Sequence, residues 1–324
     1  MNRDGQISVL DLVQVAVSYG SQVPVSSPAD VNADGWVNLF DLVAVARCMG
    51  SATPPAPTPT STPTVPTPQV YPTPMPPTPP DGLSTCYILT KEFFIGAYAI
   101  REWSDAEIPE HPAMLDVLTL SAVGQPQIQI DYPDRIDDVT GSDITGEGHP
   151  DLAVHTFSGG AHCCFNTIVY DLGPIPIQVM NTPPMDCDGE FQDLDRDGRP
   201  EFVTCDNPFA YRYCCGAGSP MVKVILQYRV GHGFVPASPS FQYAYDQDIG
   251  DHTRQAEQAQ PGGSCELDGT TKCAVLPLVL DYLYSGRPVD ARNALWRFYL
   301  YADEPRFENE IWATVTQSPL YTPY

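Results

Sequence analysis

A proline- and threonine-rich stretch at residues 52–80 constrains the chain most strongly, because it divides the sequence in two. Proline lacks a backbone N–H and favours the polyproline II backbone, so such a stretch is extended and cannot bury a core. At about 3.1 Å per residue it reaches on the order of 90 Å when fully extended. The sequence therefore predicts a module at residues 1–51, a linker at residues 52–80 and a larger domain at residues 81–324.

The charge balance narrows the classes of partner. The chain carries 40 acidic and 16 basic residues, which gives a formal net charge of −24. Phosphate backbones and anionic membrane surfaces are poor partners for such a chain, whereas cations are natural ones. The sequence also contains no run that approaches the ~18 continuous apolar residues of a membrane span. We therefore expect neither nucleic-acid binding nor membrane insertion.

Ten cysteines indicate an oxidising compartment, because disulfides persist outside the cytosol. We predict an extracellular or cell-surface protein with disulfides rather than zinc sites or reactive thiols. Cys265 and Cys273 close a short glycine-containing loop, which favours a bond between these two, and Cys48 is the single cysteine of its module. The cysteines expected in disulfides are Cys163, Cys164, Cys187, Cys205, Cys214, Cys215, Cys265 and Cys273.

The first fifty residues contain an internal repeat, since residues 1–11 align with residues 31–41 at an offset of thirty. The second copy has oxygen-bearing side chains at loop positions 1, 3, 5, 9 and 12, and Gly35 at position 6 allows the sharp turn of a calcium loop. Each loop leads into an apolar segment with helical spacing. The calcium ligands expected from this spacing are Asp30, Asn32, Asp34, the carbonyl of Trp36, Asn38 and Asp41.

This pair of EF-hand-like loops, each followed by one short helix, resembles the type I dockerin, a duplicated module that docks onto cohesin domains. The resemblance implies further calcium ligands at Asn2, Asp4, Gln6, Ser8 and Asp11, in a loop whose first position would precede Met1. Dockerins commonly recognise cohesin through a pair of hydroxyl side chains just before the last calcium ligand of each loop. At these positions this chain has the apolar residues Val9, Leu10, Leu39 and Phe40. The partner is therefore expected to be a cohesin-like receptor or another copy of this chain.

Two shorter acidic loops begin fifty residues apart in the large domain, at residues 143–151 and 193–201. Both resemble the nine-residue calcium loops of integrin-type, FG-GAP-like β-propeller repeats, and the second matches them more closely. A metal-free turn is the alternative, and it has more weight for the first loop because Thr145 and Glu147 depart from the pattern. The ligands that the resemblance implies are Asp143, Thr145, Glu147, His149, Asp151, Asp193, Asp195, Asp197, Arg199 and Glu201.

The large domain has two kinds of periodicity. Short β-branched and aromatic runs alternate with Gly, Pro and Asp clusters from Asp81 onward, which predicts a mainly-β domain. After about Cys265 the spacing becomes helical and predicts a small C-terminal helical cap. Residues 135–321 also resemble an uncharacterised secreted bacterial module with integrin-like repeats. The expected fold is thus multidomain: a small all-α dockerin-like module, an extended linker, and a β domain of propeller-like repeats with a helical cap.

The hydroxyl side chains of the linker lie among prolines, a composition typical of O-glycosylated stalks. An unmodified spacer is the alternative. The candidate glycosylation sites are Thr58, Thr60, Ser61, Thr62, Thr64, Thr67, Thr73 and Thr78.

The sequence lacks the common catalytic motifs: no serine-centred elbow, phosphate loop or His-Glu-x-x-His element occurs. Calcium also accounts for the spacing of the conspicuous acids. We therefore expect a non-enzymatic interaction or assembly protein, in which head-to-tail docking would give a filament. The alternative is a carbohydrate-binding or glycoside-hydrolysing component of a cellulosome-like complex, because dockerins usually carry enzymes and aromatic residues are frequent near the C-terminus.

Overall fold

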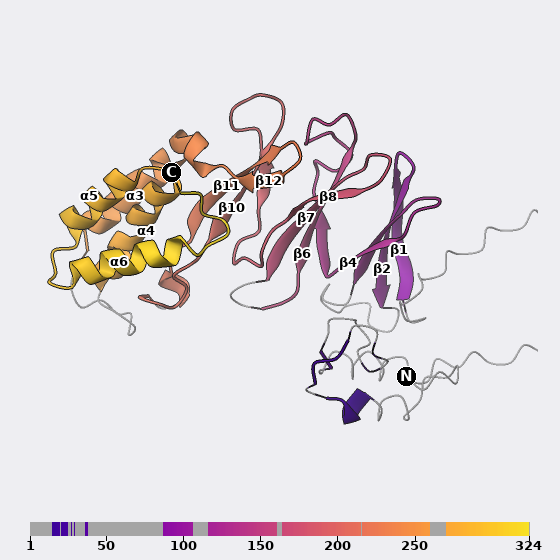
Figure 1. Cartoon of the computed structure of the whole chain (residues 1–324), viewed down its shortest axis with the longest axis horizontal. Coiled ribbons are helices and arrows are strands. Elements are labelled where there is room, and N and C mark those ends of the chain that lie inside the picture. Colours follow the sequence, from indigo (N-terminus) through magenta and orange to yellow (C-terminus); the bar gives the residue numbers. More distant parts are fainter. Residues whose placement is uncertain are drawn as a thin grey trace, which may run out of the picture. The chain divides into compact units, whose positions relative to one another are not determined.

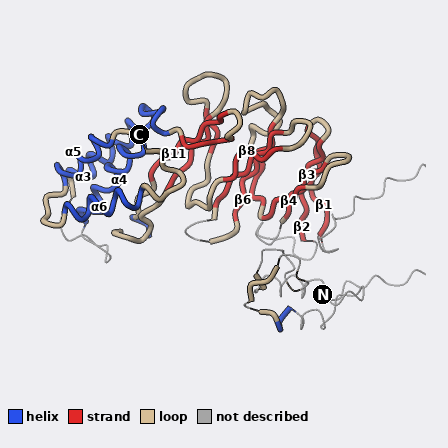
Figure 2. The backbone as a smooth tube through the Cα atoms, viewed as in Figure 1, coloured by secondary structure: helices blue, strands red, loops and turns tan. Residues whose placement is uncertain are grey.

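The computed structural model describes residues 15–19, 21–24, 27, 29, 36–37, 87–105, 116–160, 164–214, 216–259 and 270–323 (Figure 1). Contacts divide the chain into two compact units, one formed by residues 1–93 and 101–119 and the other by residues 94–100 and 120–324. The predicted boundaries at residues 51 and 80 lie outside the described residues. The described part is mainly β, and its helices gather toward the C-terminus (Figure 2).

The first sheet has the strand order β1-β2-β3-β4. Its strands are β1 (Tyr87–Ile95), β2 (Tyr98–Asp105), β3 (Val117–Ser121) and β4 (Ile128–Asp131). A two-residue turn joins β1 to β2, and it begins at Gly96, whose φ of 57° suits glycine. Buried Trp103 donates its indole N–H to Thr119 Oγ1 at 2.9 Å, which satisfies the polar atom of the largest side chain buried there.

The next two sheets are four-stranded antiparallel meanders of the same kind, with orders β5-β6-β7-β8 and β12-β11-β10-β9. The strands of one are β5 (Pro133–Ile136), β6 (Asp151–Phe157), β7 (Phe165–Asp171) and β8 (Ile177–Asn181). Those of the other are β9 (Glu190–Gln192), β10 (Glu201–Asp206), β11 (Val222–Arg229) and β12 (Gly233–Pro236). Strand β6 is buried on both faces, whereas β7 alternates buried and half-buried residues. The mainly-β character predicted for the large domain is confirmed in its described residues.

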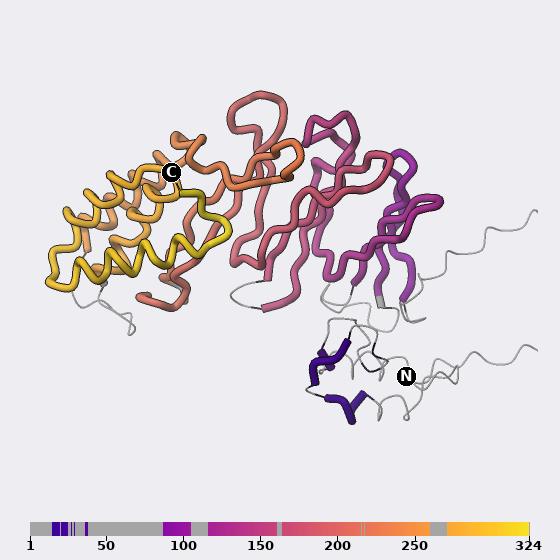
Figure 3. The backbone as a smooth tube through the Cα atoms, in the orientation of Figure 1, coloured from indigo at the N-terminus to yellow at the C-terminus, as the bar shows by residue number. Residues whose placement is uncertain are grey.

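Helices follow the last sheet (Figure 3). They are η3 (Ser238–Tyr245), α3 (Asp246–Glu257), α4 (Thr270–Tyr284), α5 (Pro288–Phe298) and α6 (Glu304–Val315), while the short η2 (Gly216–Gly218) lies between β10 and β11. Proline lies in the first turn of α5 and α6, where its missing N–H costs nothing. Helix α4 is apolar on nearly every side because α3, α5 and β11 surround it. The predicted C-terminal helical cap is confirmed, and it includes α3, which the periodicity did not reveal.

One apolar core joins this cap to the two meanders. Val169 of β7, Val224 of β11, Val279 of α4 and Ile311 of α6 belong to the same cluster, and each is at most 1 % exposed. Burying such side chains supplies most of the favourable free energy of folding. The helices are therefore part of the fold of the β domain rather than a separate module.

The N-terminal region is described only in fragments. Residues 15–17 are helical, and Gln22 and Trp36 form an isolated antiparallel bridge. Val15 and Val37 are fully buried, while Trp36 is half exposed. A small all-α module is not evident among these fragments, and the rest of the predicted module and the linker lie outside the described residues. No helix in the described part of the chain is both long and apolar enough to span a bilayer.

Candidate functional site

Two acidic loops precede equivalent strands of the two meanders. The first loop (residues 143–151) runs into β6, and the second loop (residues 193–201) runs into β10. In each case the ninth loop residue, Asp151 or Glu201, is the first residue of the strand. The fifty-residue spacing in the sequence thus corresponds to a repeated loop-and-strand unit.

The first loop is closed by its two end carboxylates. Asp143 accepts the backbone N–H groups of Gly146, Glu147 and Gly148 at 2.7, 3.1 and 2.9 Å. Asp151 Oδ2 accepts the N–H groups of Ile144 and Thr145 at 2.8 and 3.1 Å. A carboxylate that accepts several N–H groups fixes a tight turn without help from side-chain packing.

The second loop repeats this pattern. Asp193 accepts the N–H groups of Asp197 and Gly198 at 3.0 and 3.1 Å. Glu201 Oε2 accepts the N–H of Leu194 at 2.9 Å, the same link between positions 9 and 2 that Asp151 makes in the first loop. The two segments therefore fold into related turns although their side chains differ at positions 3, 5, 7 and 9.

Carboxylate oxygens gather on the second loop. Oxygens of Asp193, Asp195 and Asp197 all lie within 4.8 Å of one another, and all three residues are exposed. Arg199 donates to Asp197 Oδ2 at 2.8 Å, and this bond lowers the pKa of Asp197. The loop can offer a cation several hard oxygen ligands, and the arginine offsets part of their charge.

Each of the two loops ends on a buried carboxylate, whereas its other acids are exposed. Asp151 is 0 % exposed, and burial raises its pKa to about 6 with help from the nearby charges of Asp171 and Asp143. Tyr228 of β11 donates to Glu147 Oε1 at 3.0 Å, which holds this loop side chain. Burial, followed by that bond, raises the pKa of Tyr228 to about 12. The loop is therefore tied to both meanders.

All ten ligands that the FG-GAP resemblance implies lie in these two loops, on described residues. Most other predicted site residues lie outside the described part, and the exceptions are Trp36 and five of the cysteines. They include the calcium ligands Asn2, Asp4, Gln6, Ser8, Asp11, Asp30, Asn32, Asp34, Asn38 and Asp41, and the docking residues Val9, Leu10, Leu39 and Phe40. The linker sites Thr58, Thr60, Ser61, Thr62, Thr64, Thr67, Thr73 and Thr78 lie outside it too, as do Cys48, Cys163, Cys215 and Cys265.

Two disulfides join described cysteines, as the composition predicts. Cys187 pairs with Cys205 of β10, and Cys214 pairs with Cys273 of α4. The predicted bond between Cys265 and Cys273 is wrong, because α4 brings Cys273 against the segment that follows β10. Cys164 is also disulfide-bonded. Short spacing in the sequence did not predict the disulfide pairing, since the fold brings together two cysteines that are 59 residues apart.

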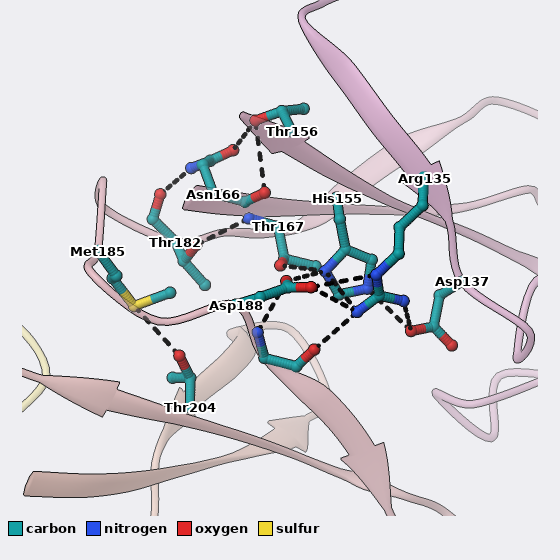
Figure 4. Close-up of polar contacts among 11 residues, drawn as sticks. Arg135, Asp137, His155, Thr156, Asn166, Thr167, Thr182, Met185, Asp188 and Thr204 are labelled. Carbon is teal, nitrogen blue, oxygen red and sulfur yellow. Dashed lines mark hydrogen bonds and ion pairs between the residues drawn. The ribbon is translucent and has the colours of Figure 1, made fainter. Parts of the chain in front are cut away.

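A charge cluster, in which buried His155 and Asp137 contact the partly exposed side chains of Arg135 and Asp188, is a feature that the sequence did not reveal (Figure 4). The register places Arg135 of β5 opposite His155 at the centre of β6. Asp137 Oδ2 lies 2.8 Å from His155 Nε2, and Asp188 Oδ1 lies 2.7 Å from Nδ1. Arg135 then donates to Asp188 at 2.8 Å and to Asp137 at 3.1 Å.

The cluster holds an imidazolium between two carboxylates. Burial alone would lower the pKa of His155, but the bonds to Asp137 and Asp188 outweigh it, so the pKa is raised. Burial would likewise raise the pKa of Asp137, yet the bonds from His155, the Val139 N–H and Arg135 lower it to about 2. Both ring nitrogens therefore act as donors, and the charge of the ring is matched on both sides.

A catalytic role for this cluster conflicts with the burial of His155. Thr167 Oγ1 lies 3.0 Å from His155 Nδ1, which gives a hydroxyl, an imidazole and a carboxylate in contact. His155 and Thr167 are each only 1 % exposed, so a substrate has no access to either. The cluster instead links β5 and β6 to the segment that enters β9. No local spacing signals it, because Arg135 and Asp188 are 53 residues apart.

The C-terminal aromatics divide between the core and the surface. Tyr284 is buried and donates to Asp206 at 2.6 Å, and Tyr299 packs against Phe307. Trp296 and Tyr301 are about half exposed on or next to α5. Searches against protein-family models, curated proteins and solved structures find no match for the chain.

Proposed function

We propose that this chain is a non-enzymatic, calcium-binding extracellular interaction protein, whose dockerin-like module docks onto a partner or a neighbouring copy. The observation that carries the calcium proposal is the shared shape of the first and second loops. In each, the first and ninth residues fix the turn through backbone N–H groups, and further carboxylate oxygens remain for a cation. Calcium takes six to eight such oxygens in flexible geometry.

Other features are consistent with this proposal. The two four-stranded meanders, each with an acidic loop between its first and second strands, suit blade-like repeats of the integrin type. Disulfides between described cysteines favour an oxidising, extracellular setting. The net charge of −24 would repel a second copy of the chain unless cations screened or bound it.

Hydrogen exchange of the full chain, resolved peptide by peptide, tests the calcium part. We expect calcium chloride to slow exchange in residues 143–151 and 193–201 relative to protein in EGTA, because a bound ion fixes both loops. Magnesium chloride is the matched control, since the smaller ion demands octahedral geometry that these loops are not expected to supply. Unchanged exchange in both loops would reject calcium binding by the β domain.

Sedimentation velocity tests the docking part. With calcium, the full chain alone or mixed with a cohesin should form a complex that EGTA dissociates. Replacing Leu39 and Phe40 with aspartate should abolish it, whereas Val17→Asp, at a described and 83 % exposed position of the same region, should not. Docking is rejected if the unmodified, calcium-loaded chain stays monomeric and retains no cohesin. Retention on immobilised glycans instead would favour the carbohydrate-binding alternative, for which exposed Trp296 offers a stacking surface.

A further inference from the structure

A hollow of about 630 Å³ lies where the outer face of α6 meets the segment that follows β10 (Figure 1). Phe307 and Ile311, on the inner face of the helix, pack in the core. The segment after β10 contributes Arg212. The polar residues that α6 and the turn after it contribute recur at helical spacing and so share one face. They are Arg306, Asn309, Glu310, Thr314 and Gln317.

Arg212 is held in place without being neutralised. Its guanidinium lies 5.8 and 5.5 Å from the ring centroids of Phe209 and Tyr213, and it donates to Thr314 Oγ1 at 2.5 Å. No ion pair among the described residues involves Arg212, although the chain carries 40 acidic side chains. Its charge is therefore oriented by uncharged groups and remains available to a ligand.

The backbone next to Arg212 is strained. Tyr211 has a φ of 57°, in the left-handed region that is unfavourable for a residue other than glycine. Its N–H donates to Ser219 Oγ at 2.9 Å, and its ring lies so close to Gly216 that an added Cβ there would come within 2.7 Å of it. The adjacent disulfide to α4 ties the same segment down. Such strain persists only where the surrounding structure enforces it, and here it fixes Arg212 at the hollow before a ligand binds.

Arg306 supplies a second guanidinium. Its side chain is 71 % exposed, and its contacts with Asp303 and Glu310, at 3.5 and 3.8 Å, are longer than normal hydrogen bonds. Lys272 already binds Asp303 at 3.0 Å, and the Tyr213 hydroxyl donates to Glu310. Exposed ion pairs of this length contribute little, so Arg306 is free to turn to a ligand. Two guanidinium groups at one hollow suit a carboxylate, because each presents paired N–H donors to its oxygens.

The other lining residues restrict the ligand further. Glu310 would repel a bare anion, whereas a ligand with a hydroxyl group beside its carboxylate can donate a hydrogen bond to it. Asn309 and Gln317 add amides, which donate and accept and so suit further hydroxyl groups. Pro305 and Ala313 give the hollow an apolar part that a sugar ring can cover. Because the net charge of −24 opposes any anion at long range, recognition depends on this fit.

We propose that this hollow binds a uronic-acid sugar, whose ring carries one carboxylate and several hydroxyl groups. Arg212 and Arg306 hold the carboxylate, and Glu310 accepts a hydroxyl of the ring. Asn309 and Gln317 bind the remaining hydroxyl groups. The site uses no residue of the first or second loop, so it does not rest on the proposed calcium binding. It also differs from a stacking surface at the exposed tryptophan of α5, because charge selects the ligand.

Saturation-transfer NMR of the full chain tests this inference with matched sugars. Methyl galacturonoside or methyl glucuronoside should receive saturation from the protein, whereas methyl galactoside and methyl glucoside, which lack the carboxylate, should not. Acetate, which lacks hydroxyl groups, and alanine, which lacks the ring, should not displace the bound sugar at equal concentration. Arg212→Gln and Arg306→Gln should each weaken binding by about tenfold or more. Arg229→Gln, at an exposed arginine at the end of β11, is the control and should leave binding unchanged.

A variant that keeps every charge guards against misfolding. Ala313→Trp, at an exposed position of α6 that lines the hollow, should block the sugar and keep the melting temperature within about 2 °C of that of the unmodified chain. The inference is overturned if neither uronic-acid sugar binds, or if the neutral sugars, acetate or alanine bind as well. Unchanged binding by Arg212→Gln or by Ala313→Trp would overturn it too. So would binding that is lost in Trp296→Ala but kept in Arg212→Gln, because the sugar would then lie on α5.

Discussion

Replacing His155 with leucine should destabilise the β domain by about 3–5 kcal/mol, the usual cost of removing one partner from a buried ion pair. The variant keeps the side-chain volume near that of imidazole but removes the His155 bonds to Asp137 and Asp188, so that these two carboxylates share Arg135 alone. The pKa of Asp137 gives an independent magnitude. Its fall from the ordinary 3.8 to about 2 corresponds to roughly 2 kcal/mol from this group, at ~1.36 kcal/mol per pKa unit, and His155 supplies part of it together with the Val139 N–H and Arg135.

The loss should depend on pH in a defined direction. The pKa of His155 is raised on folding, so its contribution is complete below its ordinary value of 6.5 and is lost as pH rises through the folded value. The pKa of Asp137 is lowered, so its contribution is present above 3.8 and is lost as pH falls toward 2. The difference between the unmodified and variant chains should therefore be largest between about pH 4 and 6.5.

Urea denaturation of the oxidised full chain in a calcium-containing buffer, followed by near-ultraviolet circular dichroism, measures this difference. Urea is preferred to guanidinium chloride because salt would screen the charges under study. His232→Gln, at an exposed histidine, is the control and should change stability by less than about 0.5 kcal/mol. Adding Asp137→Asn to His155→Leu should restore part of the loss, since it removes the uncompensated charge. A loss below about 1 kcal/mol that does not change between pH 5 and 9 would refute the ionic description of the cluster.

Two further predictions concern covalent and steric constraints. Replacing Cys187 and Cys205 together with serine should lower the unfolding free energy by about 3 kcal/mol, because the bond removes chain entropy from the unfolded state of a loop of this length. A peptide map of the unreduced protein should link these two residues. A map that pairs either of them with another cysteine would contradict the fold. Gly189→Ala should destabilise the domain by roughly 1–3 kcal/mol, because an added Cβ would overlap the ring of buried Phe202. Gly250→Ala, inside α3 with room for a methyl group, should instead stabilise it by about 0.5–1 kcal/mol, and thermal unfolding of both variants distinguishes these signs.

Local patterns predicted the loops, several strands and the C-terminal helices, because each depends on residues close in sequence. Nine-residue spacing located Asp143 and Asp193, and apolar periodicity located the core of α4. Helix α3 was missed because its apolar face is narrow: Ala256 is its buried residue. A polar helix that covers a core with few side chains leaves a weak periodic signal.

Features that depend on strand register could not be predicted in this way. Asp171 meets Asp151 only because β6 and β7 pair at one register, and a shift of one residue would place these side chains on opposite faces. His155 meets Asp188 through a connection of 33 residues. The partner of Cys273 depends on how α4 packs, which the spacing to Cys265 does not reveal.

The bond between Cys214 and Cys273 changes how the chain responds to proteases. It spans the stretch that holds β11, β12, η3 and α3, and it ends on α4. A backbone cut anywhere in that stretch leaves two pieces that one covalent bond still holds together. A single cut there therefore cannot release the last three helices until the bond is reduced. The domain would remain in one piece after such a cut outside cells, whereas a reducing cytosol would allow the two fragments to separate.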